Sequence, residues 1–117
     1  MSEPAQGGRL VEVGDTRLHV VERGTGDLAL LVLHGGPGLD HTMFGSSLDA
    51  LGDVCRLFLV DQRSQGRSER TAEGWSINQM ARDVDGLARA LDLDQYVVLG
   101  HSFGSFVALA HAVEFSG

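Results

Sequence analysis

The feature that most constrains this chain is a set of three short apolar segments, at 28–33, 56–60 and 96–99, each followed at once by a polar or glycine-rich loop. The first of them, LALLVL, is continuously apolar, as strands buried on both faces of a sheet are. The loop HGGPG that follows it at 34–38 can continue neither a strand nor a helix. The other two segments, RLFLV and YVVL, have the same character, so we expect three buried strands.

Helical patterns alternate with these strands. Residues 77–91 place apolar side chains on one face at a spacing of 3.6 residues. Ser76 and Gln79 fit a capping box, in which each side chain accepts from a free backbone N–H at the start of the helix. We expect a further helix at 102–113 and a short one within 42–51. The apolar face of the long helix is interpreted as core packing.

The sequence predicts an antiparallel hairpin before the first apolar segment. Residues 9–13 and 17–23 alternate between polar and apolar and are separated by Gly-Asp at 14–15, a turn dipeptide. Residues 1–8 are interpreted as a flexible polar tail. Residues 9–117 are interpreted as part of a single domain, with no internal repeat and no interdomain linker.

A hairpin followed by three strand–helix units defines the expected fold class, which is α/β, with a mostly parallel sheet and helices on both faces. Active sites in such sheets gather at the carboxyl ends of the strands. The three unusual loops, at 34–38, 61–68 and 100–104, each follow the carboxyl end of a predicted strand. We therefore expect the functional site at these three loops.

Composition and charge narrow the classes of function. Hydrophobic residues make up 43% and charged residues 21% of the chain, so we expect little disorder. The net charge is −7, and all nine positive residues are arginines, which argues against a nucleic-acid groove and against a basic membrane-binding stripe. The one local arginine cluster is interpreted as solvated or structural rather than ligand-binding. It consists of Arg63, Arg67 and Arg70, flanked by Asp61 and Glu69.

The single cysteine, Cys55, cannot form an intramolecular disulfide, and it precedes an apolar run where a free cysteine is expected to be buried. The first ten residues, MSEPAQGGRL, have neither the basic nor the apolar region of a secretion signal. No apolar run approaches the length needed to span a bilayer. The simplest interpretation is a soluble cytoplasmic protein.

The sequence GHSFG at 100–104 has the pattern of a turn that presents a nucleophilic serine, Ser102. The pattern Gly-x-Ser-x-Gly is weak alone, but here it stands between a predicted strand and a predicted helix, the setting that the motif requires. A strained turn holds the serine oxygen clear of the sheet, and Gly100 and Gly104 are expected to keep side chains away where strand and helix approach. The alternative is a tight glycine-rich turn with an incidental serine.

An acyl-transfer site also needs two N–H donors that point at the developing oxyanion. One donor is expected at Phe103, directly after the serine, where the positive end of the following helix also lies. The second is expected in the loop at 34–38, whose glycines let the backbone approach a substrate. The alternative for this loop is an ordinary turn between a strand and a helix.

Together these motifs resemble the α/β-hydrolase superfamily and, within it, the proline iminopeptidase-like branch of serine peptidases. HGGPG at 34–38, DQRSQGRS at 61–68 and GHSFG at 100–104 stand in the order and spacing of that superfamily. The resemblance covers nearly the whole chain after its first few residues. It implies that 9–117 is the N-terminal part of a single α/β-hydrolase domain, whose C-terminal strands and cap are absent.

The resemblance implies a role for three residues. Ser102 would be the nucleophile, and the backbone N–H groups of Gly36 and Phe103 would form the oxyanion hole. The substrate would be a small molecule or short peptide cleaved at an ester or amide bond, with neither a metal nor an organic cofactor. Two departures stand out: Ser64 replaces a usual glycine, and His101 and Phe103 replace the glycine and tryptophan frequent in iminopeptidases. The His-Ser-Phe form is common in esterases.

A base that could activate Ser102 is missing from the sequence that follows it. In this superfamily the acid and the histidine come after the serine, and here only His111 and Glu114 remain. His111 lies nine residues along the predicted helix, about 13 Å away by helical rise, and is interpreted as a surface or packing residue. His34 is interpreted as an organiser of the oxyanion loop. The other histidines, His19, His41 and His101, form no pair with metal-ligand spacing.

Three hypotheses follow. The leading one is an N-terminal portion of a serine α/β-hydrolase that is inactive alone. The second is a non-catalytic fragment or interaction module, completed by a partner chain or self-associating at the sheet edge that the 96–99 strand would leave open. The third is a non-functional remnant.

Overall fold

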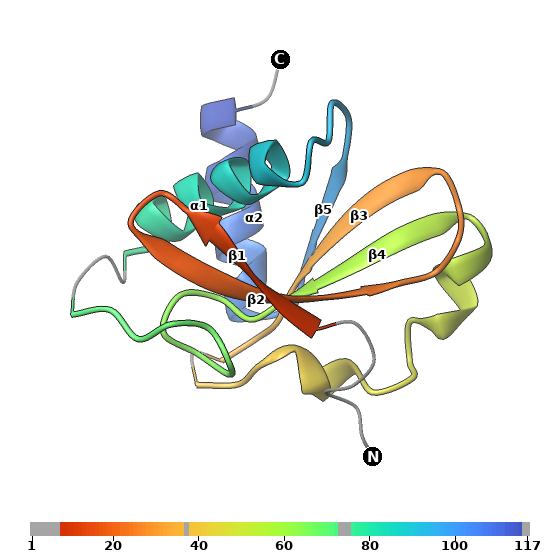
Figure 1. Cartoon of the computed structure of the whole chain (residues 1–117), viewed down its shortest axis with the longest axis horizontal. Helices are drawn as coiled ribbons and strands as arrows, with labels where there is room; N and C mark the ends of the chain where they lie inside the picture. The colour runs from red at the N-terminus through yellow and green to blue at the C-terminus, as the bar shows by residue number, and fades with distance from the viewer. Residues whose placement is uncertain (1–7, 37, 73–75, 116–117) are drawn as a thin grey trace.

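A computed structural model describes residues 8–36, 38–72 and 76–115 of the chain (Figure 1). The tail expected at 1–8 lies outside the described residues, except for Gly8, which already belongs to the first strand. No helix in this described part combines the length and the hydropathy that a bilayer crossing requires.

The five strands form one sheet in the order β1-β2-β4-β3-β5 (Figure 1). The predicted hairpin is confirmed as an antiparallel pair, β1 with β2, and β2 also pairs antiparallel with β4. On the other side β4, β3 and β5 run parallel, as the alternation of strands and helices predicted. The strands are β1 Gly8–Val13, β2 Thr16–Arg23, β3 Leu28–Leu33, β4 Cys55–Val60 and β5 Val97–Gly100.

Both α-helices, α1 Ile77–Ala90 and α2 Phe103–Phe115, pack together on one face of the sheet (Figure 1). Their apolar side chains join those of alternate strand residues, among them Leu31, Phe58 and Val60, in the larger core cluster. The period of 3.6 residues that predicted α1 from the sequence is thus the period of its buried face.

The opposite face is covered by the segment between β3 and β4 rather than by an α-helix. A helix within 42–51 was expected; the structure has two short 3-10 helices instead, η2 His41–Phe44 and η3 Asp49–Asp53. Gly45, with a φ of 51°, interrupts the helical backbone between them. Of the helices in the described residues, the two α-helices lie on the first face and these two 3-10 helices lie between β3 and β4 on the second. This segment places Phe44 and Leu48 against the smaller core cluster.

One half of the predicted capping box is present at the start of α1. The hydroxyl of Ser76 accepts a hydrogen bond of 3.0 Å from the backbone N–H of Gln79. The Gln79 side chain has other partners: its oxygen accepts from Arg82 at 3.2 Å, and its NH2 group donates to Asp83 at 3.0 Å. Asp83 is buried, so its carboxylate depends on hydrogen bonds from the protein. Its other partner, Arg63, is described below.

The strand β5 is less buried than the sequence predicted. Its residues alternate between exposed and half-buried because successive side chains point to opposite faces of the sheet. β3 pairs with one edge of β5 and no strand of the described residues pairs with the other, which leaves the strand less covered. An apolar strand is buried on both faces only where neighbouring strands and helices cover it. The local sequence of β5 does not show whether such neighbours are present. The open edge expected for the 96–99 segment is therefore observed.

Candidate active site

The turn between β5 and α2 holds Ser102 in a strained backbone conformation. Its φ is 54°, in the left-handed region that few residues other than glycine adopt, and its side chain is exposed. A Cβ on Gly100 would collide with the carbonyl oxygen of Gly104. A Cβ on Gly104 would lie 2.5 Å from the carbonyl oxygen of Leu33. Both glycines are thus required by close backbone contacts, as their positions in the motif predicted.

The HGGPG loop lies directly against this turn. A Cβ on Gly35 would be 3.2 Å from the Cβ of Ser102, and the backbone N–H of His101 donates to the carbonyl of Leu33 at 3.1 Å. Gly36 has a φ of 114°, which is accessible to glycine and strained for other residues. Two of the three predicted loops therefore meet at Ser102. Pro37 of this loop lies outside the described residues.

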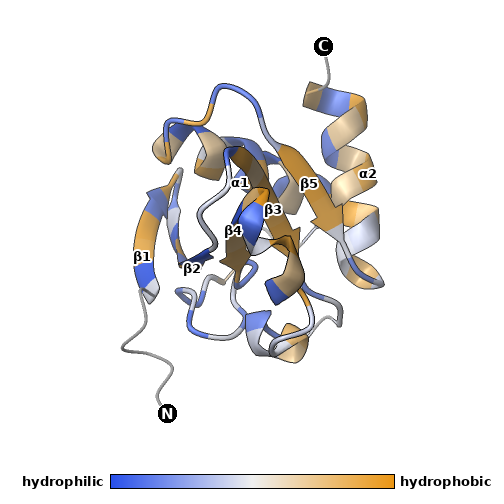
Figure 2. Cartoon of the chain, turned by 90° about the vertical axis from the view of Figure 1, so that its right-hand side faces the viewer, coloured by the Kyte–Doolittle hydropathy of each residue, from blue (hydrophilic) through white to orange (hydrophobic). Residues whose placement is uncertain are grey.

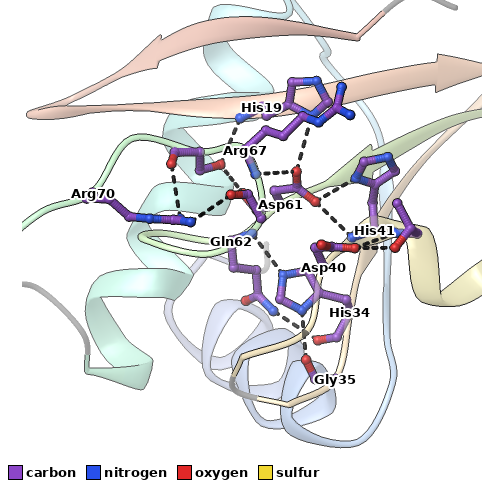
Figure 3. A network of polar contacts seen from close by, with 12 residues as sticks. His19, His34, Gly35, Asp40, His41, Asp61, Gln62, Arg67 and Arg70 are labelled. Carbon is purple, nitrogen blue, oxygen red and sulfur yellow. Dashed lines mark hydrogen bonds and ion pairs between the residues drawn. The ribbon is translucent and has the colours of Figure 1, made fainter. Parts of the chain in front are cut away.

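His34 is buried and joins the HGGPG loop to the loop after β4 (Figure 3). Its Nε2 accepts from the backbone N–H of Gln62 at 3.0 Å, and the Gln62 side chain donates to the carbonyl of His34 at 3.0 Å. Its Nδ1 donates to the carbonyl of Gly35 at 2.7 Å. Burial keeps the pKa of His34 below its ordinary value, so the ring is neutral and can accept at Nε2. These contacts agree with an organising role for His34.

A second clamp on the same loop comes from Gln65. Its side-chain oxygen accepts from the backbone N–H of Gly38 at 2.8 Å, and its amide donates to the carbonyl of Arg63 at 3.2 Å. The loop after β4 thus holds both ends of the HGGPG loop. The loop after β4 is therefore a structural element beside the site.

Asp61 is the centre of a buried polar network that the sequence analysis did not predict (Figure 3). Its Oδ1 accepts from the backbone N–H of His41 at 2.8 Å and from Nδ1 of the same residue at 2.7 Å. Its Oδ2 accepts from Nδ1 of His19 at 3.1 Å and from the backbone N–H of Arg67 at 3.0 Å. The only sequence signal for this network is a charged residue placed directly after a continuously buried strand.

The hydrogen bonds to Asp61 outweigh its burial. Burial alone would raise the pKa of this carboxyl, but the hydrogen bonds from His41 and from the backbone N–H of Arg67 keep it below its usual value. Asp61 is therefore ionised at neutral pH, and it ties β2, η2 and the loop after β4 to one carboxylate.

His19, His41 and Asp61 also form the kind of cluster that can bind a metal ion, since their donor atoms lie within 4.8 Å of one another. The expectation of no metal-ligand pair among the histidines rested on sequence spacing, and the fold brings these two rings to 5.4 Å between centroids. However, each oxygen of Asp61 already accepts two hydrogen bonds. The arrangement is a hydrogen-bonded junction centred on the Asp61 carboxylate.

The arginines of the loop after β4 are structural. Arg63 is buried and binds Asp83 through two hydrogen bonds of 2.9 Å, so it is not solvated. Asp15, in the turn of the hairpin, accepts a further hydrogen bond of 2.7 Å from Arg63. Arg70 donates to the carbonyls of Ser68 and Gly66. The sequence analysis interpreted this arginine cluster as solvated or structural, and these contacts support a structural role.

Within the described residues, no histidine hydrogen-bonds to Ser102 and no hydrogen bond reaches its side-chain oxygen. His101 turns toward Phe44, with 6.4 Å between ring centroids. His111 is buried on α2, where its Nε2 lies 2.8 Å from the hydroxyl of Tyr96 and its ring packs against Phe115. Of the two interpretations of His111 from the sequence, a surface residue or a packing residue, the structure supports the second. A serine without a base is a poor nucleophile.

The chain belongs to the alpha/beta hydrolase fold family, whose sequence profile matches residues 29–116. A proline iminopeptidase of Pestalotiopsis fici is 34% identical over 110 residues, which are 91% of this chain and 39% of the relative. A 2-(acetamidomethylene)succinate hydrolase of Mesorhizobium japonicum is 32% identical over 107 residues, or 92% of this chain and 38% of the relative.

Solved structures give the same assignment. The proline iminopeptidase-related protein of Thermus thermophilus superimposes with a TM-score of 0.85 at 32% identity, covering 92% of this chain and 40% of that protein. The predicted resemblance to α/β-hydrolases and to proline iminopeptidases is therefore confirmed. The chain spans about two fifths of the length of these relatives.

Proposed function

We propose that this chain carries the nucleophile and the oxyanion hole of a serine hydrolase that cleaves an ester or amide bond. The observation that supports this most is the position of Ser102, exposed at a left-handed turn directly before α2. Such a turn between a parallel strand and a helix presents a nucleophile at the carboxyl edge of the sheet.

In the proposed reaction, Ser102 Oγ attacks the substrate carbonyl carbon while a base accepts its proton. The N–H groups of Gly36 and Phe103 donate to the oxyanion that forms. Phe103 is the first residue of α2, where backbone N–H groups have no acceptor within the helix. Collapse of the intermediate expels the alcohol or amine and leaves an acyl-enzyme, which water hydrolyses.

The named relatives support a small molecule or a short peptide as the substrate, with proline iminopeptidase-like cleavage as the first candidate. No metal or cofactor has a step in this chemistry. A cytoplasmic location is part of the proposal, and the free, buried thiol of Cys55 is compatible with a reducing compartment.

We further propose that the 117 residues alone are catalytically incompetent, because none of the described histidines reaches Ser102. Removing the base of a catalytic triad lowers the rate by orders of magnitude. The second candidate function, a non-catalytic interaction module, is favoured by the open edge of β5.

A fluorophosphonate probe, which labels activated serines, tests this proposal. We expect negligible labelling of the isolated chain within a time that labels an active serine hydrolase fully. Slow residual labelling should disappear in Ser102→Ala and persist in Ser46→Ala, a change at an exposed serine remote in sequence from the turn. Rapid stoichiometric labelling of Ser102 in the isolated chain would refute incompetence; labelling that survives Ser102→Ala would refute its role as nucleophile.

A further inference from the structure

The backbone N–H of Gly35, next to the proposed oxyanion donor Gly36, is held by a thioether. It donates to the sulfur of Met43 at a distance of 3.2 Å. Met43 belongs to η2, which follows the HGGPG loop beyond the carboxyl end of β3. Figure 2 shows β3 and β5 side by side, with their arrowheads toward the lower part of the view, where the loops that follow both strands lie. Met43 is therefore a contact between η2 and the candidate active-site loop.

The residues on either side of Met43 fix the position of η2. His41 is buried and is bound to Asp61 through both its backbone N–H and its ring. Phe44 packs against the smaller core cluster and meets the ring of His101 edge-on, with 6.4 Å between ring centroids. Because η2 is anchored on both sides of Met43, the fold brings this side chain to the HGGPG loop.

Other side chains that hold the HGGPG loop differ from Met43 in chemistry and in exposure. His34 and Gln65 bind the backbone of this loop through nitrogen and oxygen atoms, and both are buried. Met43 offers the sulfur of a thioether, which is a weak hydrogen-bond acceptor, and its side chain is exposed. Of these contacts, the one at Met43 is therefore the weakest and the one that solvent reaches.

A thioether that solvent reaches can be oxidised to a sulfoxide. Of the two methionines among the described residues, Met43 is 37% exposed, whereas Met80 lies in the core and is 3% exposed. In the reaction, the sulfur lone pair attacks one oxygen of hydrogen peroxide and the O–O bond breaks. The proton on the transferred oxygen passes to the departing hydroxide to give water. The sulfur is oxidised by two electrons, and the peroxide is reduced by the same two.

A sulfoxide at Met43 cannot keep the contact with Gly35. The sulfur lies 3.2 Å from the amide nitrogen, so an oxygen bound to the sulfur does not fit between them. The S=O group is polar, and because Met43 is already at the surface, it can turn toward water. Gly35 itself is buried, so its N–H loses an acceptor at a place shielded from water, which costs free energy.

We propose that Met43 is a site of oxidation by peroxides, and that its sulfoxide releases the N–H of Gly35 and loosens the HGGPG loop. The consequence for catalysis rests on the proposed function, in which Gly36 of the same loop donates to the oxyanion. A donor in a loosened loop is less preorganised and stabilises the developing charge less. The oxidised form would then be the slower hydrolase, and reduction of the sulfoxide would restore the rate.

Peptide-resolved mass spectrometry after graded treatment with hydrogen peroxide tests the modification. In the folded chain we expect Met43 to gain one oxygen well before Met80 does, because Met80 is shielded by the core. In concentrated urea the two residues should react alike. Equal rates in the folded chain, or a difference that persists in urea, would overturn the proposal, because exposure in the fold would then not select Met43.

Amide hydrogen exchange tests the effect on Gly35. Oxidation of Met43 should speed exchange of the Gly35 amide by about fivefold, the factor that corresponds to about one hydrogen bond. Methionine sulfoxide reductases with a thiol reductant should reverse the change. Unchanged or slower exchange after oxidation would refute the release of this N–H.

Two leucine variants separate Met43 from other oxidisable residues. Met43→Leu keeps an apolar side chain but has no acceptor, so the Gly35 amide should exchange fast before treatment and not respond to peroxide. Met80→Leu should respond as the unchanged chain does. A peroxide response that survives Met43→Leu would assign the effect to another residue, such as the thiol of Cys55, and would refute the proposal.

The outcomes for oxidation and for catalysis are separable, because both measurements use the isolated chain and need no activity. Fluorophosphonate labelling that survives Ser102→Ala would refute the proposed nucleophile and leave the results for Met43 and Gly35 as they are. A Gly35 amide that does not respond to oxidation would refute this inference and leave the role of Ser102 untouched.

Discussion

The guanidinium of Arg63 is fully buried and meets both carboxylate oxygens of Asp83 through hydrogen bonds of 2.9 Å. This pair joins the loop after β4 to α1, and it brings together residues that lie twenty positions apart. Because the two charges are removed from water, each depends on the other for its hydrogen bonds. The pKa of Arg63 is raised further by this contact, so the guanidinium stays charged at any ordinary pH.

We predict that Asp83→Ala destabilises the fold by about 3–5 kcal/mol, because it leaves a buried guanidinium without its main partner. The free energy of unfolding in urea measures the effect. Asp15→Ala removes the other, exposed partner of Arg63 and serves as the control, with a much smaller expected loss. Equal losses for the two variants would mean that burial of the pair contributes nothing.

We predict that Gly104→Ala destabilises the chain by about 1–3 kcal/mol, since its Cβ would meet the carbonyl oxygens of Leu33 and His34 at 2.5 and 2.7 Å. These are backbone atoms of a buried strand end and cannot move cheaply. Gly86→Ala in α1 is the matched control. Its Cβ would meet only a methyl group of Val13 at 2.9 Å, and replacing a helical glycine gains about 1 kcal/mol. Thermal and urea unfolding should show that Gly86→Ala is much more stable than Gly104→Ala. The reverse order of stability would contradict the backbone contact at Gly104.

Ser64 has a φ of 63°, in the left-handed region that favours glycine, the residue that the resemblance led us to expect at this position. Its hydroxyl accepts from the backbone N–H of Thr71 at 2.8 Å, which partly offsets the strain. Ser64→Ala should be less stable than both the unchanged chain and Ser64→Gly, because it keeps the strain and loses the hydrogen bond. Ser64→Gly loses the bond but relieves the strain, and should be about 1 kcal/mol more stable than Ser64→Ala by urea unfolding. Equal stability of Ala and Gly here would exclude strain at this position.

Acidification should destabilise the fold in two stages. Burial lowers the pKa values of His19, His34 and His111 in the folded state, so the unfolded chain binds more protons as the pH falls through 6.5. The contribution of these neutral rings to the free energy of unfolding is complete above that pH and declines below it. The lowered pKa of Asp61 adds a second loss below about pH 4, where the unfolded carboxyl becomes protonated.

Urea unfolding at about pH 7.5, 5.5 and 4 measures this dependence. His19→Gln, which keeps a side-chain donor for Asp61, should weaken the decline between the first two of these pH values. Ser46→Ala, at an exposed residue that does not titrate, should leave the decline as it is. A free energy of unfolding that rises on acidification through about pH 6 would contradict the assignment of neutral buried histidines.

Several parts of this structure follow from local sequence patterns. The apolar run at 28–33 and the alternation at 9–23 specify strands because their periods match those of sheet residues, and the spacing from Ile77 onward specifies α1. The glycines around Ser102 are equally local, since a tight turn between strand and helix excludes side chains at fixed positions. One local prediction was wrong: the backbone at Gly45 turns the expected short helix into two 3-10 segments.

The remaining features depend on contacts between residues that are distant in the chain. The junction of His19 and His41 at Asp61 joins positions 42 and 20 residues apart, and no spacing rule brings two such rings to one carboxylate. The exposure of β5 also depends on distant residues. An apolar run shows that the side chains of a strand are suited to burial, but only neighbouring strands and helices determine whether they are buried.

The sequence by itself therefore determined the family, the order of strands and helices, and the place of Ser102 at the carboxyl edge of the sheet, since each rests on a periodic or local pattern. Only the tertiary structure decided that Arg63 is buried and that Asp61 ties three segments together. These properties depend on contacts between residues that are far apart in the chain, and no local sequence pattern shows which residues make those contacts.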